Sequence, residues 1–100
     1  MRARTRLGRK SIWWWRTQPI AWVDPREVQW ADTPVNRRAV EHYKRRPHRP
    51  FDPWNHDGDP CVVRTADGRH MEGRNGKHRA IAAIETHRRL RVRLHQENAQ

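Results

Sequence analysis

The sequence of 100 residues has little cysteine, few acidic residues and no long apolar run. Its single cysteine, Cys61, excludes an internal disulfide, and the chain has no Cys-x-x-Cys pair of the kind that binds zinc. No stretch is apolar over a length that would form a membrane-spanning helix. We therefore expect a cytoplasmic protein without stable membrane insertion and predict no metal site.

Positive charge is the most prominent feature that the sequence does have. Lysine and arginine number 22 against 11 acidic residues, which gives a net charge of +11 and a pI near 11.6. An excess of this size attracts polyanions, so nucleic acid or a nucleotide is the expected partner. Only 34% of the residues are hydrophobic, which predicts one small domain with a thin core.

The first half of the chain divides into a tail, a tryptophan-rich segment and a loop. Residues 1–11 lack apolar periodicity and are predicted to form a disordered basic arm, followed by a single domain over residues 12–96. Aromatic and β-branched side chains favour strand structure around the tryptophans, and we place a strand at Ile20–Val23. Four prolines predict a long loop over residues 47–60.

The remaining elements follow from hydrophobic periodicity and from turn residues. They are a helix from Thr33, its predicted N-cap, to about Arg46, a hairpin at Asp67-Gly68 between strands 61–65 and 70–72, a helix over 77–88 and a strand over 90–94. Together they predict an α+β fold, with a small mixed sheet and two helices.

The turn before the second predicted helix combines glycines with cations. Gly73 and Gly76 allow a ligand to approach the main chain, and the first turn of a helix offers unpaired N–H groups at its positive end. The sequence therefore predicts a phosphate site formed by Gly73, Arg74, Asn75, Gly76, Lys77, His78 and Arg79. The alternative is a tight turn alone, in which cations at a helix start carry a small cost.

The second half of the chain also resembles the N-terminal domain of ParB-type partition proteins and the related sulfiredoxins. The resemblance covers about residues 20–96 and is specific over 60–95. The residues that carry it are Cys61-Val62-Val63-Arg64, the Asp67-Gly68 hairpin, Gly76-Lys77-His78-Arg79-Ala80-Ile81-Ala82-Ala83 and Leu90-Arg91-Val92-Arg93-Leu94.

This resemblance implies a ParB/sulfiredoxin-like fold that binds nucleoside triphosphate phosphates through Gly76 and Arg79. It also implies a bacterial, phage or mobile-element origin and a relation to nucleotide-hydrolysing proteins and to proteins described as ParB-like nucleases. The chain departs from the family at Lys77, where partition proteins usually have glutamate and sulfiredoxins have cysteine.

Glu72 is the candidate catalytic residue if the protein is an enzyme, because it is the acid nearest to the turn on the strand side. A carboxylate there would activate water or orient Mg²⁺. The alternative is a salt bridge to Arg69 or Arg74. The sequence leaves open whether the protein hydrolyses a phosphate ester or only binds it.

A second hypothesis uses the tryptophan-rich segment. Trp13, Trp14 and Trp15 lie beside Arg16, and stacked tryptophans with a neighbouring cation suit single-stranded nucleic acid. With the basic arm they would form a non-catalytic nucleic-acid-binding module. The alternative is that two or three of these tryptophans fill the small core.

Overall fold

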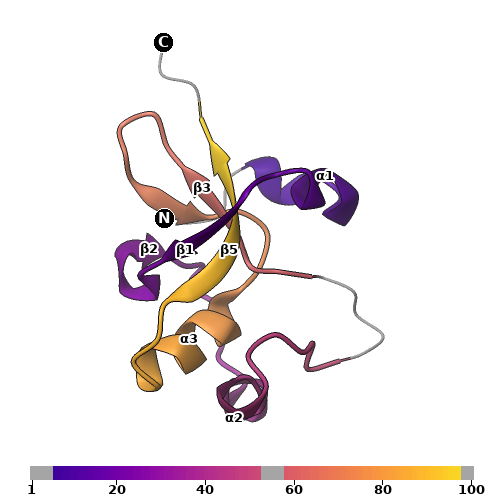
Figure 1. Ribbon diagram of the computed structural model, residues 1–100, viewed down its shortest axis with the longest axis vertical. Helices are drawn as coiled ribbons and strands as arrows, with labels where there is room; N and C mark the ends of the chain where they lie inside the picture. The colour runs from indigo at the N-terminus through magenta and orange to yellow at the C-terminus, as the bar shows by residue number, and fades with distance from the viewer. Residues whose placement is uncertain (1–5, 53–57, 98–100) are drawn as a thin grey trace.

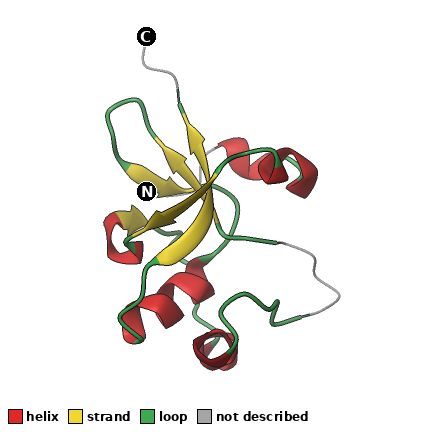
Figure 2. Cartoon of the chain, viewed as in Figure 1, coloured by secondary structure: helices red, strands yellow, loops and turns green. Residues whose placement is uncertain are grey.

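The computed structural model describes residues 6–52 and 58–97 (Figure 1). Residues 1–5 of the predicted arm and residues 53–57 of the predicted loop lie outside the described residues. Five strands form one mixed sheet of order β1-β5-β3-β4-β2, with helices around it (Figure 2). The strands are β1 (Ile20–Val23), β2 (Val28–Gln29), β3 (Cys61–Arg64), β4 (His70–Glu72) and β5 (Leu90–Gln96). The predicted α+β class is confirmed.

The sheet combines both kinds of strand pairing. The pairs β1–β5 and β3–β4 are antiparallel, whereas β5–β3 and β4–β2 are parallel. The hairpin between β3 and β4 turns at Gly68, whose φ is 91°, as the Asp67-Gly68 pair predicts. The two-residue strand β2 was not predicted, because it is defined only by its pairing with β4.

Three α-helices accompany the sheet: α1 (Ile12–Arg16), α2 (Arg37–Arg45) and α3 (Lys77–Glu85). Two were predicted, and α1 replaces the strand preference of the tryptophan-rich segment. Ser11 caps α1 by accepting a hydrogen bond from the N–H of Trp14 at 3.2 Å. No helix in the described part of the chain has the length and apolar character needed to cross a membrane.

The other helix boundaries differ from the predicted ones at identifiable residues. Asn36, and not Thr33, caps α2, because its Oδ1 accepts from the N–H groups of Arg38 and Ala39 at 3.0 and 3.4 Å. Helix α3 ends at Glu85, three residues before its predicted end. A short 3₁₀ helix, η2 (Pro25–Glu27), joins β1 to β2.

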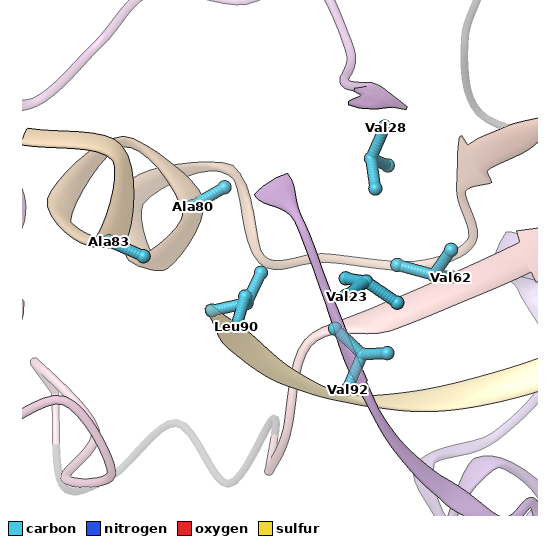
Figure 3. Close-up of a cluster of buried hydrophobic side chains, with 7 residues drawn as sticks. All are labelled: Val23, Val28, Val62, Ala80, Ala83, Leu90 and Val92. Carbon is cyan, nitrogen blue, oxygen red and sulfur yellow. The ribbon is translucent and has the colours of Figure 1, made fainter. Parts of the chain in front are cut away.

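One face of the sheet, which we call the first face, packs against α3. Its core consists of Val23, Val28, Val62, Ala80, Ala83, Leu90 and Val92 (Figure 3). Val62 and Val92 have no exposed surface, and burial of such a side chain is worth about 1.5 kcal/mol or more. Aliphatic side chains, mostly valine and alanine with Leu90, therefore join the helix to the strands.

The opposite face of the sheet, the second face, is covered in part by α1. Cys61 and Val63 alternate with Val62 along β3 and pack against Trp15, which is only 1% exposed. The indole N–H of Trp15 donates to the carbonyl oxygen of Leu7 at 3.2 Å. Leu7 belongs to a 3₁₀ helix, η1 (Arg6–Arg9), so this stretch of the predicted disordered arm is ordered against the sheet.

The remaining helix, α2, is attached to α3 by ion pairs. Glu85 of α3 lies 2.8 Å from Arg37 and 2.6 Å from Lys44. Hydrogen bonds from Arg37 and then from Lys44 lower the pKa of Glu85 to about 2. These pairs join the C-terminal end of α3 to α2. At the other end of α3, where the predicted turn lies, the N–H of Asn36 before α2 donates to the ring of His78.

Candidate phosphate-binding site

The predicted phosphate turn, residues 73–79, connects β4 to α3 and is attached to the start of β3. The N–H of Gly73 donates to the carbonyl oxygen of Cys61 at 2.7 Å, and the N–H of Cys61 donates to that of Asn75 at 3.0 Å. Gly76 then forms the N-cap of α3 with a φ of 124°, a conformation that favours glycine. The sheet therefore fixes the path of the turn.

Both glycines of the turn are required by packing. A Cβ at Gly73 would lie 2.5 Å from the ring of Trp15, and a Cβ at Gly76 would overlap the ring of Pro60. Side chains do not fit at such positions without displacing their neighbours. Packing alone therefore explains why glycine occupies both positions, whether or not a ligand approaches the main chain there.

Two of the predicted ligands, Lys77 and His78, contact the segment before α2. The Nζ of Lys77 donates to the backbone oxygen of Thr33 and, at 3.3 Å, to its Oγ1. The Nε2 of His78 accepts from the N–H of Asn36 at 2.9 Å, which places the ring proton on Nδ1. Burial, followed by the charge of Lys77, lowers the pKa of His78. At neutral pH the imidazole is therefore uncharged and helps to hold α2 beside α3.

Arg79 reaches from the first turn of α3 toward the loop before β3. Its Nη1 donates to the carbonyl oxygen of Gly58, and its guanidinium carbon lies 4.9 Å from the centroid of the Tyr43 ring, within cation–π range. A guanidinium has five N–H donors, so these contacts leave donors for an anion. Arg79 is held in place beside a cavity.

That cavity, of about 240 Å³, opens in front of α3. Its lining consists of Asn36, Ala39, Tyr43, Pro50, Phe51, Asp52, Asn75, Gly76, His78 and Arg79. Among the described residues no side chain caps α3, and an uncapped helix start is an anion-binding arrangement. The cavity therefore combines the first N–H groups of α3, one guanidinium and the amide of Asn75.

Arg74 and Glu72 do not line this cavity. Glu72 lies on β4 with 1% of its surface exposed, so its carboxylate is not placed to reach a ligand there. Asp52 is the acidic residue in the lining, and no local pattern in the sequence pointed to it. Arg69, one of the predicted partners of Glu72, pairs with Asp67 at 3.0 Å.

Sequence reasoning also missed the aromatic wall of the cavity. The hydroxyl oxygen of Tyr43 accepts from the N–H of Phe51 at 3.0 Å. The ring of Phe51 lies 5.5 Å from that of His42 at an interplanar angle of 72°. These contacts hold the loop after α2 against the helix. The available signal was the helical spacing of Tyr43 from Ala39 and Val40 in the sequence, a pattern that indicates core packing only.

A search against protein-family models, curated proteins and solved structures finds no match to this chain. The resemblance to ParB-type proteins therefore stays a prediction. What the chain does is inferred from its geometry.

The structure separates the tryptophans that were predicted to contact nucleic acid. Trp15 is buried against β3 and is not available for stacking. The rings of Trp14 and Trp15 meet edge-to-face with their centroids 5.0 Å apart, and Trp14 is partly buried. Trp13 is 70% exposed, with the guanidinium of Arg16 4.8 Å from its ring centroid. Trp13 and Arg16 are the members of the predicted contact that lie open to a ligand.

Metal-binding side chains do not gather in the described part of the chain. Within residues 6–52 and 58–97, no group of three or more histidine, cysteine or acidic side chains is arranged to hold a metal ion. The Mg²⁺ that the sequence analysis associated with catalysis therefore has no ligand cluster among these residues.

Proposed function

We propose that the chain binds a phosphate-bearing ligand, a nucleotide or a phosphate of a nucleic acid, in the cavity in front of α3. The observation that carries this proposal is the uncapped start of α3, which opens into a cavity beside Arg79. A bound phosphate would accept from the first N–H groups of the helix and from the guanidinium fork. The positive end of the helix dipole stabilises the same charge.

The size of the cavity limits how much of the ligand it can enclose. Pockets that enclose drug-sized ligands measure roughly 300–1,000 Å³, and this cavity measures about 240 Å³. It therefore suits one or two phosphate groups, with the rest of the ligand outside. Phe51 lines the cavity, is 38% exposed and offers an aromatic surface to a nucleobase.

We further propose that the fold is ParB/sulfiredoxin-like. What supports this assignment is the chain order of β3, the hairpin, β4, the turn around Gly76, α3 and β5. In that fold the helix start holds nucleotide phosphates, as the resemblance implies. The contacts of Lys77 with Thr33 give this residue a structural role, consistent with its departure from the family pattern.

Titration of inorganic phosphate, CTP, ATP and a short oligonucleotide against wild type and two variants tests the proposal. Arg79→Ala removes a charge-assisted donor worth roughly 1.5–3 kcal/mol, so we expect affinity to fall about tenfold or more. Asn75→Asp places a carboxylate beside the helix start, where it competes with the phosphate, and we expect a similar loss. Arg38→Ala is the control, because Arg38 is an exposed arginine on α2 outside the cavity lining.

The two variants keep the outcome interpretable. Arg79 also contacts Gly58 and Tyr43, so the folding of its variant is checked by circular dichroism. Asn75→Asp keeps the size of the side chain. If both folded variants bind every phosphate ligand as wild type does, the proposed site is wrong.

An enzymatic extension of this proposal rests on the position of the acids. Hydrolysis at this cavity needs a carboxylate within reach of the phosphate, and Asp52 lines the cavity whereas Glu72 does not. Incubation of ATP or DNA with Mg²⁺ measures any hydrolysis. We expect such activity to be lost in Asp52→Asn and kept in Glu72→Gln. The opposite pattern would restore Glu72 as the catalytic candidate.

A further inference from the structure

The second face of the sheet is left open beside β1. Trp22 and Ile20 alternate along this edge strand with Ala21 and Val23, which point to the core of the first face. The exposed fractions of Trp22 and Ile20 are 56% and 49%. A half-exposed tryptophan on a strand is a large apolar surface that the fold does not use for its own core.

Arginines surround this tryptophan. Arg91 lies directly across from Trp22 in the β1–β5 pair, and cross-strand partners lie on the same face. A cavity of about 310 Å³ beside Trp22 is lined by Arg79, Arg88, Arg89 and Arg91, and by no acidic side chain.

A ring contact and one ion-paired carboxylate lie beside this cavity. The ring of His48 meets the ring of Trp22 edge-on, with centroids 6.5 Å apart and planes at 86°. Asp59 pairs with Arg91 at 3.0 Å and with Arg93 at 3.5 Å. One carboxylate therefore faces several guanidinium groups, so the surface keeps a positive excess.

The positive surface continues toward α1. A second cavity, of about 160 Å³, shares His48 and Arg79 with the first and adds Arg16, Arg93 and the ion-paired Asp59 to its lining. Beyond Arg16 lies the exposed ring of Trp13. The two cavities thus form a basic track that runs from Trp13 at one end to Trp22 at the other.

We propose that this track binds single-stranded nucleic acid, with an unpaired base stacked on Trp22 and the backbone phosphates against the arginines. A tryptophan face can stack only on a base that is free of its partner strand, and arginine forks bind phosphate oxygens in pairs. Arg79 lines both this track and the cavity in front of α3, so variants at Trp22, Arg89 and Asn75, and not Arg79→Ala, distinguish the two proposals.

Fluorescence anisotropy with labelled single-stranded DNA, single-stranded RNA and duplex DNA tests this inference on the full chain. Stacking of one base is worth about 1–3 kcal/mol, so we expect Trp22→Ala to weaken single-strand binding by about five- to 100-fold. Trp22→Phe keeps an aromatic face and should keep most of the affinity. Arg89→Ala should weaken binding and reduce the slope of log K against log salt by about 0.7, whereas Arg38→Ala should change the affinity less.

The outcomes separate this surface from the phosphate cavity. Trp22→Ala should leave the affinity for inorganic phosphate and CTP unchanged, and Asn75→Asp should leave oligonucleotide stacking on Trp22 unchanged. Tryptophan fluorescence quenching by the oligonucleotide, lost in Trp22→Ala, reports stacking directly. Equal single-strand affinity of wild type and Trp22→Ala would overturn the inference. Stronger binding to duplex DNA, or to vesicles containing anionic lipid than to either single strand, would overturn it as well.

Discussion

The two faces of the sheet are covered in different ways. On the first face α3 packs over five strand residues, and the cluster is built from small aliphatic side chains. On the second face one large side chain, Trp15, covers Cys61 and Val63 of β3, and β1 keeps Trp22 exposed. The first face therefore positions α3 after the turn, whereas the second face is divided between a core around Trp15 and an open surface.

The largest expected effect contrasts two tryptophans on the second face. Trp15→Ala should lower the free energy of unfolding by about 3–5 kcal/mol, because it removes a buried aromatic ring. Trp22→Ala should change it by less than about 1 kcal/mol, because more than half of that side chain is exposed. Urea denaturation measures both. Similar losses in the two variants would contradict the division of this face.

The next effect concerns how α3 is seated on the first face. Gly76→Ala combines a positive φ with overlap on Pro60, and strain of this kind together with overpacking costs about 3 kcal/mol. Gly68→Ala is the matched control. It shares a positive φ but has open space around it, so we expect a loss of about 1 kcal/mol. Equal urea midpoints for the two variants would show that contact with Pro60 is not what requires glycine at position 76.

The smallest effect is expected from the ion pairs that attach α2 to α3. The pKa of Glu85 is lowered to about 2 in the folded chain from 4.5. The contribution of the ionised Glu85 to the free energy of unfolding is therefore present above pH 4.5 and is lost as the pH falls toward 2. We expect Glu85→Gln to flatten the fall in urea midpoint over that interval, and high salt to weaken the same contribution. An unchanged acid profile would show that these exposed pairs do not hold α2.

Local sequence patterns predicted the elements that are defined by neighbouring residues. The strand at Ile20–Val23, the Gly68 turn and the start of α3 at Lys77 agree with the structure, and the strand predicted over 61–65 ends one residue earlier, at Arg64. The helix α1 was missed because burial of Trp15 and the cap at Ser11 outweigh the strand preference of its aromatic residues. The packing of Trp15 against Cys61 and Val63 joins residues far apart in the sequence, so it cannot be predicted from neighbouring residues alone.

The candidate site was predicted only where it is local. Gly76, His78 and Arg79 line the cavity, as the turn pattern indicated. Asn36 and Tyr43 line it from α2, and their approach depends on how two helices pack. The same packing diverts Lys77 to Thr33 and makes His78 an acceptor for Asn36. A run of cations in a sequence therefore does not show which of them face a ligand.

The most direct test of the proposed phosphate site is an amide-resolved NMR titration of the wild-type chain with inorganic phosphate and CTP. We predict that the largest shifts occur at the N–H groups of residues 76–79, with little change around Trp22, and that Asn75→Asp suppresses them. Saturable binding with no shift at residues 76–79 would contradict a phosphate site at the start of α3.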